Sequence, residues 1–298
     1  MIERLALPFD YDEPLFRPPS EWRSLILQIT HGCSHNRCSF CGMYRMKRFR
    51  VRRLEQIEAE IDACAAQLGP MIDRVFLADG DALVVKPRTL LQILEHLRAR
   101  FPRLRRINAY ATPQNLLIKS PEQLREIRAA GLGMLYVGLE SGDATILRDI
   151  DKGVTPGAFV EACARAHDAG FKLSLTVLNN LVGPERSAAH VAGTVEVINR
   201  VAPAYFACLT LIPGPMLGPH TEAVGWARMS DRQVFDEISG MIEGVEVDGI
   251  EFRANHASNA LPLKGRLTRE RDKLLALLRE ARIDPAASGA RPIWMRSL

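Results

Sequence analysis

The stretch Ile29–Tyr44 reads ITHGCSHNRCSFCGMY and places three cysteines, Cys33, Cys38 and Cys41, within nine residues. It follows an apolar run that predicts a buried strand. Three thiols at the end of a strand suit a metal better than a core, because cysteine thiolates hold iron–sulfur clusters and zinc. With three protein ligands, one iron of a four-iron cube stays open to an outside molecule. The loop therefore predicts an exchangeable iron site, and half of a zinc site is the alternative, with His31 or His35 as the fourth ligand.

The composition bounds the class of protein. The 298 residues, 47% of them apolar, suit one large domain or one domain with an appendage. The N-terminal stretch is acidic and broken by prolines, which predicts no signal peptide, and no apolar run reaches the length of a membrane span. The other three cysteines, Cys64, Cys163 and Cys208, stand alone, which is not a secreted disulfide framework and favours a reduced cytoplasm. A net charge of +4 says little about partners.

Strand and helix patterns alternate along residues 24–216. The expected strands are Ser24–Thr30, Asp73–Ala78, Arg105–Tyr110, Gly133–Leu139, Lys172–Val182 and Ala204–Ile212. The expected helices are Leu54–Leu68, Pro87–Arg100, Pro121–Ala130, Asp143–Ile150, Pro156–Ala169 and Ser187–Val201. Six strand–helix units predict an α/β fold, a partial (β/α)6 barrel with functional loops at the carboxyl ends of parallel strands.

The alternation stops near residue 219. Helices are expected over Ser230–Glu243 and Thr268–Arg282, with a short strand over Gly249–Ala254. We therefore expect a lead-in over 1–23, the barrel over 24–218, and a mostly helical extension over 219–298 that forms a lid or wall. The polar loop Asn255–Gly265 holds Asn255, His256 and Asn259, candidates for contact with a substrate, and an ordinary turn-rich loop is the alternative.

The cysteine loop has the form C-x4-C-x2-C, with Phe40 just before the last cysteine. It resembles the cluster loop of the radical S-adenosylmethionine (SAM) superfamily, whose usual spacing is C-x3-C-x2-C, one residue shorter. The resemblance implies a 4Fe–4S cluster held by the three cysteines, SAM as second cofactor, and Phe40 and Tyr44 beside them.

Two further stretches resemble motifs of that family. Asp79-Gly80-Asp81 follows the second strand and resembles the motif whose backbone meets the ammonium group of SAM; an ordinary turn is the alternative. Glu140, followed by the segment that ends at Lys152, resembles the branch that includes oxygen-independent coproporphyrinogen oxidase, Elongator and methylthiotransferases. There the resemblance implies that Glu140 contacts SAM and that Lys152 pairs with its carboxylate, and a structural ion pair is the alternative.

After the fifth strand, Asn179–Arg186 resembles the family's adenine-binding stretch, which points to Asn179, Val182 and Arg186 as cofactor contacts. It departs from that stretch at Asn179, where the family has glycine, and at Arg186, where it has an acidic residue. Arg186 instead offers a fork for a carboxylate, or packs at the start of the next helix. Ile212–Met216 resembles the stretch under the adenine but lacks its threonine.

The resemblance implies an enzyme that cleaves SAM reductively to a 5′-deoxyadenosyl radical, which abstracts hydrogen from a substrate that the sequence does not reveal. An electron donor similar to flavodoxin or ferredoxin is the implied partner. Two alternatives stay open: an iron–sulfur sensor without SAM turnover, and cleavage of SAM to a 3-amino-3-carboxypropyl radical.

Arg45–Arg53 holds six basic residues in nine. This run predicts either a surface for an anionic partner or a solvated loop paired with Glu55, Glu58 and Glu60. Nucleic acid stays open as a partner, although binding surfaces of that kind are usually broader and carry interleaved aromatic residues.

Overall fold

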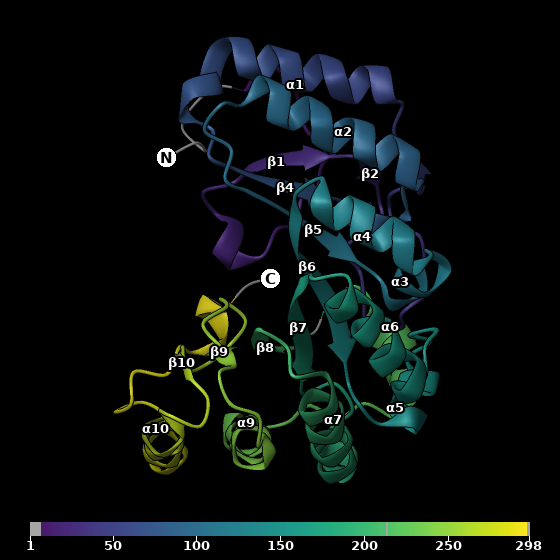
Figure 1. Cartoon of the computed structure of the whole chain (residues 1–298). Helices are drawn as coiled ribbons and strands as arrows, with labels where there is room; N and C mark the ends of the chain where they lie inside the picture. The colour runs from purple at the N-terminus through teal and green to yellow at the C-terminus, as the bar shows by residue number, and fades with distance from the viewer. Residues whose placement is uncertain (1–6, 213, 297–298) are drawn as a thin grey trace. The chain divides into compact units, whose positions relative to one another are not determined.

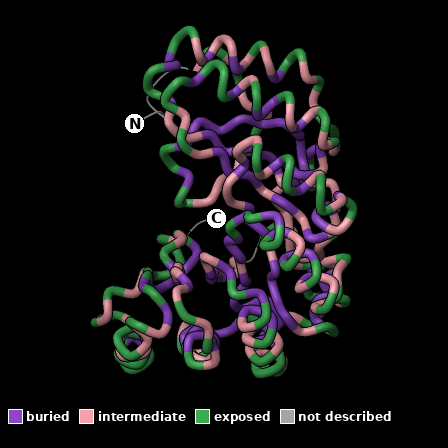
Figure 2. Tube along the Cα trace, in the orientation of Figure 1, coloured by how far each residue is buried: buried purple, intermediate pink, exposed green. Residues whose placement is uncertain are grey.

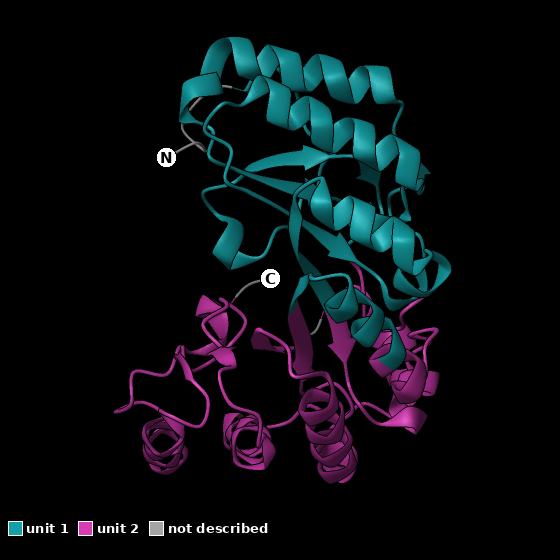
Figure 3. Ribbon diagram, in the orientation of Figure 1, with its two compact units in different colours: residues 1–36, 43–137, 161–173 teal, residues 37–42, 138–160, 174–298 magenta. Residues whose placement is uncertain are grey.

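The computed structural model describes residues 7–212 and 214–296. Residues 1–6 of the expected lead-in and Pro213 of the expected adenine stretch lie outside the described residues. The chain divides into two compact units, and each is described by itself (Figure 3). Unit 1 comprises residues 1–36, 43–137 and 161–173, and unit 2 comprises residues 37–42, 138–160 and 174–298.

Unit 1 holds the first half of the strand–helix alternation. Its strands are β1 (Leu25–Gln28), β2 (Thr30–His31), β3 (Arg50–Val51), β4 (Arg74–Ala78), β5 (Arg106–Ala111) and most of β6 (Leu132–Glu140). Its helices are α1 (Leu54–Leu68), α2 (Pro87–Arg100), α3 (Pro113–Ile118), α4 (Pro121–Ala129) and the end of α6 (Pro156–Asp168). Strands β1, β4, β5 and β6 pair in parallel, while α1, α2 and α4 lie side by side (Figure 1).

Unit 2 holds the second half and the C-terminal extension. Its elements are α5 (Ala144–Asp149), β7 (Lys172–Asn179), α7 (Ser187–Val201), β8 (Tyr205–Thr210), α8 (Leu217–Val224), α9 (Asp231–Gly244), β9 (Glu251–Arg253), β10 (Lys264–Arg266) and α10 (Arg271–Ile283). Helices α7, α9 and α10 lie in a row (Figure 1). Short 3₁₀ helices at Pro19–Glu21, Gly69–Met71, Ala82–Val84, Pro184–Arg186 and Ile293–Met295 complete the two units.

Eight strands of the described chain form one mostly parallel sheet, in the order β1-β4-β5-β6-β7-β8-β9-β10. This confirms the α/β class and the partial barrel, and all six expected parallel strands are present. The extension adds to the sheet: β9 pairs in parallel with β8, and β10 returns antiparallel to β9. Strand β9 lies within the expected strand Gly249–Ala254, whereas β10 was not expected, because three residues are too short to show an alternating pattern.

The core follows the strands, as the buried segments in Figure 2 show. Strand β1 is buried along its whole length, and β5 and β7 are buried at most positions. Strand β7 ends three residues earlier than expected, because Asn180 adopts a left-handed conformation with φ +60°, which no strand accommodates. The expected helices are present, with Ser120 and Ser230 forming capping boxes at α4 and α9.

A buried carboxylate ties the lead-in to the strands of unit 1. Glu21 is fully buried, and its oxygens accept hydrogen bonds from Asn108 Nδ2 and Tyr136 OH, both at 2.8 Å, and from Ser24 Oγ at 2.5 Å. Arg106 lies 3.1 Å from the same carboxylate. A buried charge with four partners is stable only where the chain holds them together, so this part of the lead-in is integral to the unit.

Candidate functional site

The cysteine loop connects β2 to β3. Cys33, Cys38 and Cys41 are free, partly exposed thiols, whereas the three isolated cysteines are buried. Burial raises the pKa of the Cys64 thiol to about 11 and that of Cys163 to about 12, so these thiols are unreactive core groups. Cys33 belongs to unit 1, and Cys38 and Cys41 belong to unit 2.

Gly80 lies directly against the beginning of the cysteine loop. Its backbone N–H donates to the Gly32 carbonyl at 3.1 Å. A Cβ atom at this position would lie 2.7 Å from Tyr44 Cε2 and 2.8 Å from Cys33 Cβ, distances that no real side chain tolerates. Glycine is therefore required where the loop after β4 and the cysteine loop pack together.

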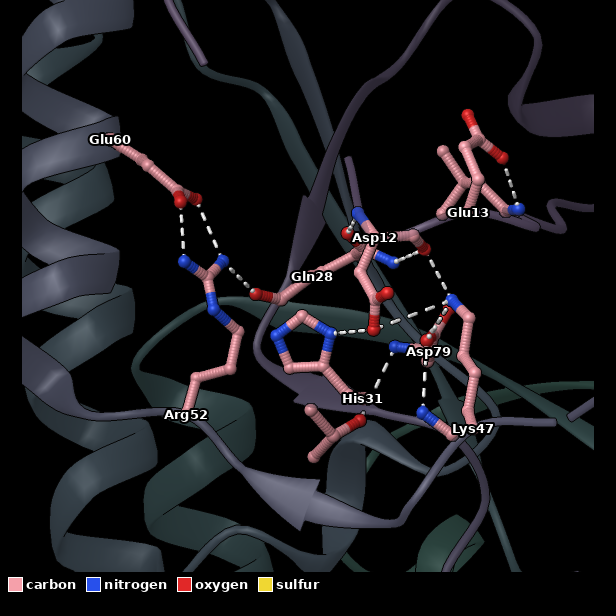
Figure 4. Close-up of polar contacts among 11 residues, drawn as sticks. Asp12, Glu13, Gln28, His31, Lys47, Arg52, Glu60 and Asp79 are labelled. Atoms are coloured by element: carbon pink, nitrogen blue, oxygen red, sulfur yellow. Dashed lines mark hydrogen bonds and ion pairs between the residues drawn. The ribbon is translucent and has the colours of Figure 1, made fainter. Parts of the chain in front are cut away.

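The charge of Asp79 is balanced inside the protein. Asp79 is fully buried, and its Oδ2 accepts from the Gly32 N–H and from Lys47 Nζ, each at 3.0 Å (Figure 4). Lys47 also donates to the Asp12 carbonyl, and the Asp12 carboxylate contacts His31 Nδ1. Because Lys47 already neutralises Asp79, this carboxylate offers an ammonium group a hydrogen-bond acceptor, Oδ1, and no unpaired charge.

Lys47 departs from both predictions made for the basic run. Its side chain is only 3% exposed, so it belongs neither to a solvated face nor to a surface for an anion. Arg52 does pair with Glu60, at 2.8 Å, which confirms the expected helix pairing for that residue (Figure 4).

Asp81 organises a second group of donors in unit 1. It is fully buried, and its Oδ2 accepts from Ser34 Oγ at 2.5 Å, from Thr112 Oγ1 at 3.1 Å and from the Asn115 amide. Burial raises the pKa of the Asp81 carboxyl. Ser34 directly follows Cys33 in the chain. Its hydrogen bond to Asp81 therefore also fixes the backbone next to the first cysteine.

Glu140 and Lys152 form an ion pair, the structural alternative to the SAM contacts that the resemblance implies. In unit 2, Lys152 Nζ lies 2.8 Å from Glu140 Oε1, and the side chains are 14% and 11% exposed. A Cβ atom on Gly138 would lie 2.1 Å from Glu140 Oε1, so glycine gives the pair its room. The arrangement brings one anion and one cation together at the end of β6.

Helix α7 supports the loop that carries Glu140. Ser141 Oγ lies 2.9 Å from His190 Nδ1, and the Gly142 N–H donates to Thr194 Oγ1 at 3.1 Å. A Cβ on Gly142 would lie 2.0 Å from the Gly193 carbonyl, so loop and helix touch by their backbones. Burial lowers the pKa of His190 to about 4. Gly193 inside α7 is the one sequence signal of these contacts, because a glycine within a helix indicates close packing.

The stretch after β7 is held by α9 of the extension. The buried Glu237 carboxylate accepts from Asn180 N–H at 2.9 Å, from Ser187 Oγ at 2.9 Å and from Asn179 Nδ2 at 3.3 Å. Burial raises the pKa of Glu237. Arg186 finds a carboxylate within the chain, Asp149 at 2.9 Å. Contacts with Glu237 and Asp149 therefore already orient the side chains of Asn179 and Arg186, the two expected SAM contacts.

Val182 belongs to an apolar cluster near the cysteine loop segment of unit 2. The cluster includes the buried Ile146, Leu181 and Val182, with Phe40 packed against it. Ser39 N–H also donates to the Ile150 carbonyl at 2.9 Å, which fixes the backbone next to Phe40.

His220 joins the cysteine loop to the stretch after β7. His220 lies on α8 and is almost fully buried. Its Nε2 lies 2.7 Å from the Leu181 carbonyl, which can only accept, so Nε2 carries the proton and Nδ1 accepts from Ser39 Oγ at 2.9 Å. The Phe40 ring meets the imidazole edge to face at 6.2 Å. No sequence signal marked this histidine.

The polar loop of the extension is partly structural. Asn259 accepts from Thr210 Oγ1 and donates to the Cys208 and Ala254 carbonyls, each at 2.8 Å, which fastens the loop to β8. His256 is half-buried, and its Nδ1 accepts from the Ser258 N–H at 3.1 Å. In the adenine-like stretch, Met216 approaches the cysteine loop, its Cγ 3.3 Å from where a Cβ on Gly42 would be.

The donor set fits an iron–sulfur cluster and SAM on observations within each unit. The cysteine thiols are partly exposed, and Asp79 Oδ1 and Asp81 Oδ1 are buried without a hydrogen-bond partner among the described residues. In the described chain, no three His, Cys, Asp or Glu side chains gather as ligands of a single metal ion. Thiolates of a 4Fe–4S cluster bind separate irons of a cube and need no such gathering.

Fold and cysteine loop define an α/β protein built to hold a metal cluster at the carboxyl ends of parallel strands. A sequence model of the radical SAM superfamily matches residues 27–198, more than half of the chain. The chain belongs to the radical SAM superfamily. It is an enzyme whose cofactors are a 4Fe–4S cluster and SAM. Among curated proteins, none matches the chain.

Solved structures of the family share the fold. Coproporphyrinogen III oxidase HemN from Escherichia coli has a TM-score of 0.56 and 16% identity, over 74% of this chain and 51% of HemN. The methyltransferase TsrM from Kitasatospora setae, solved with cobalamin and a 4Fe–4S cluster, has a TM-score of 0.53 and 20% identity, over 67% of this chain and 39% of TsrM. Methylornithine synthase PylB has a TM-score of 0.52 and 16% identity, over 89% of this chain and 85% of PylB.

These identities show likeness in fold alone. The chain spans about half the length of HemN and less than half that of TsrM. Within the described residues, no helix is long and apolar enough to span a membrane.

Proposed function

We propose that this enzyme cleaves SAM reductively and uses the 5′-deoxyadenosyl radical to abstract hydrogen from a substrate that is still to be identified. When bound, the cluster and SAM supply that chemistry: one electron breaks the sulfonium bond and gives methionine and the radical. The protein supplies ligands, orientation and exclusion of water. The observation that carries the proposal is the packing of Gly80 against Cys33 and Tyr44, because it joins the cysteine loop to the motif that meets SAM in the family.

The chain's own residues take distinct roles in the proposal. Cys33, Cys38 and Cys41 bind the cluster, and Phe40 and Tyr44 flank it. The backbone of Asp79-Gly80-Asp81 receives the ammonium end of SAM. The Oδ1 atoms of Asp79 and Asp81, which have no hydrogen-bond partner among the described residues, are nearby acceptors. Lys47 and the donors around Asp81 keep those carboxylates in place.

At the other end of the amino acid, the preformed ion pair supports a direct role. Glu140 contacts SAM, and Lys152 turns from Glu140 to the SAM carboxylate. Asn179, Val182 and Arg186 contact the adenosine, supported by Glu237 and Asp149.

The electron donor, the cellular location and the role of the C-terminal extension also belong to the proposal. The electron comes from a donor similar to flavodoxin or ferredoxin. The six free cysteines support a reduced, cytoplasmic location. The division at residues 23 and 218 assigns the extension to substrate contact, with His256 as a candidate. Neighbours in fold act on different substrates, so none is transferred to this chain.

The experiment is anaerobic reconstitution with iron and sulfide, followed by SAM and dithionite and chromatography of the nucleosides. We expect a brown protein that forms 5′-deoxyadenosine and loses this activity in Cys33→Ala, Cys38→Ala and Cys41→Ala. Methylthioadenosine as the product would establish the 3-amino-3-carboxypropyl alternative. A reduced, SAM-binding brown protein without either product would establish the sensor, and a colourless protein with zinc would overturn the assignment of iron.

A further inference from the structure

Four arginines are exposed on the arm of the β2–β3 hairpin that follows the cysteine loop. We call this arm, residues 45–53 with β3, the basic hairpin. Arg45, Arg48, Arg50 and Arg53 are exposed, whereas Lys47 is buried against Asp79 and Arg52 is bound to Glu60. The exposed positive charge is therefore a subset of the run that the sequence shows.

The basic hairpin is anchored beside the first cysteine. Strand β3 pairs antiparallel with β2, and Arg50 lies opposite His31, two residues before Cys33. A Cβ on Gly32 would lie 3.4 Å from Lys47 Cβ and 3.5 Å from Phe49 Cα, so the hairpin packs on the residue next to Cys33. All of these residues belong to unit 1.

The anchoring is polar as well as apolar. Lys47 binds Asp79, and Arg52 donates to the Gln28 carbonyl at 2.8 Å in addition to Glu60 (Figure 4). Two of the six basic side chains thus fix the hairpin to the unit, and the four exposed ones are presented from a fixed backbone. Fixed charges bind a partner with a smaller loss of entropy than mobile ones.

We propose that the basic hairpin is the docking surface for an acidic protein that carries single electrons. The inference rests on the proposed function, which needs an electron from outside the chain. Such a donor must approach the cluster closely, and the hairpin is the exposed surface built on the strand that leads to Cys33. Redox partners form small, transient interfaces in which opposite charges steer the encounter.

The composition of the surface fits a protein partner. Met46 and Val51 are 76% and 43% exposed among the arginines, which gives apolar contact surface within a charged patch. Phe49, the single aromatic residue of the run, is half-buried, so the hairpin has no exposed ring on which nucleic-acid bases would stack. Small anions are held in concave sites, whereas these arginines are exposed.

The proposed step is a single electron transfer. The donor is oxidised by one electron, and the cluster bound by the cysteines is reduced by one. No bond forms or breaks in this step, and no proton is needed.

The test compares a hairpin variant, Arg48→Glu with Arg50→Glu and Arg53→Glu, with a control variant, Arg88→Glu with Arg269→Glu and Arg279→Glu. The control changes exposed arginines elsewhere and alters the net charge equally. Each reconstituted protein forms 5′-deoxyadenosine either with a reduced flavodoxin at limiting concentration or with dithionite. The affinity of each for oxidised flavodoxin is measured by calorimetry at low and high salt.

We expect the hairpin variant to lose about tenfold in rate with flavodoxin and to bind it more weakly, while its rate with dithionite matches the wild type. The control should behave as wild type throughout, and salt should weaken wild-type binding. Equal rates and affinities for the two variants overturn the docking surface. Loss of the dithionite rate in the hairpin variant also overturns it, because the arginines would then act on the cofactor site.

A further outcome separates nucleic acid from a protein donor. Tight binding of a single-stranded RNA 12-mer by the wild type, lost in the hairpin variant while flavodoxin binding is unchanged, contradicts the proposal. If the wild type forms no 5′-deoxyadenosine with dithionite, the proposed function fails, whereas flavodoxin binding by calorimetry still tests the surface.

Discussion

A single buried lysine connects three segments of unit 1 next to the cysteine loop. Lys47 reaches the Asp79 carboxylate after β4 and the Asp12 carbonyl in the lead-in, with Asp12 Oδ2 3.9 Å away. Its removal leaves a fully buried carboxylate without a counter-charge. The contacts of Lys47 with Asp79 and Asp12 therefore stabilise the segments next to the cysteine loop.

We expect Lys47→Met to lower the free energy of unfolding by about 3 kcal/mol, the cost of breaking a buried pair from one side. Urea denaturation of the cluster-free protein measures this. Arg48→Met, which removes an exposed charge on the next residue, should change stability by less than about 0.5 kcal/mol. Equal effects of the two substitutions would show that the Lys47–Asp79 pair is unimportant.

Gly80 supports a second residue-scale prediction. In Gly80→Ala the new methyl group would lie 2.7 Å from Tyr44 Cε2 and 2.8 Å from Cys33 Cβ, so the cysteine loop must shift. We expect about half as much iron or less per chain after reconstitution, since a displaced thiolate binds poorly. Gly157→Ala, where the methyl group meets nothing within 4 Å, is the control. Full iron loading in Gly80→Ala would contradict the packing argument.

Helices α7, α8 and α9 hold loops of the site, and α8 and α9 follow the six strand–helix units in the chain. Helix α8 contributes His220, α9 contributes Glu237, and α7 contributes His190. Each binds a loop at the carboxyl end of a strand or the cysteine loop itself. The extension thus shapes the site in addition to any contact with the substrate.

His220 makes this role testable. We expect His220→Phe to weaken SAM binding about tenfold, because the Ser39 and Leu181 segments lose the two hydrogen bonds with which His220 holds them in place. His220→Gln keeps a donor for the Leu181 carbonyl and should recover part of the affinity. Equilibrium dialysis gives the affinity, and the electron paramagnetic resonance spectrum of the reduced cluster with SAM reports whether the geometry changed. A Phe variant that matches the wild type in both would refute the role.

His190 predicts a pH dependence of stability. Burial lowers its pKa from 6.5 to about 4, so the fold favours the neutral imidazole. Its contribution is complete above pH 6.5 and is lost as the pH falls toward 4, roughly 3 kcal/mol in total. We expect the free energy of unfolding to fall more steeply between pH 7 and 4.5 in the wild type than in His190→Gln. Parallel curves of unfolding free energy against pH for the two proteins would contradict this role of His190.

For the molecule as a whole, the sequence predicts the fold class and the six parallel strands but not the contacts that support the loops of the site. Alternating apolar patterns revealed six parallel strands, and the C-x4-C-x2-C loop revealed the family. Glu140 and Lys152 form an ion pair in the structure, and their contacts with SAM stay a prediction. These features are local in sequence or belong to a recognisable motif.

The sequence does not reveal these supporting contacts because they join residues that are far apart in the chain. Ser39 and His220 are 181 positions apart, and Glu237 and Asn180 are 57 apart, so no periodic pattern connects them. Lys47 stands in a run with five other basic residues, a pattern that predicts exposed side chains. Its burial could therefore not be predicted from the run. Strand β9 was recognised as a strand, but its parallel pairing with β8 depends on tertiary packing.

Cys33, Cys38 and Cys41 leave one iron of the cluster without a protein ligand, and we propose that SAM binds this iron through its amino nitrogen, which loses a proton on binding. Electron–nuclear double resonance of the reduced, reconstituted protein with SAM labelled with ¹⁵N in its amino group measures whether that nitrogen is bound. We expect a nitrogen coupling from a ligand bound to iron, present in the wild type and absent without SAM. A cluster that binds SAM by equilibrium dialysis but shows no such coupling would contradict the open iron site.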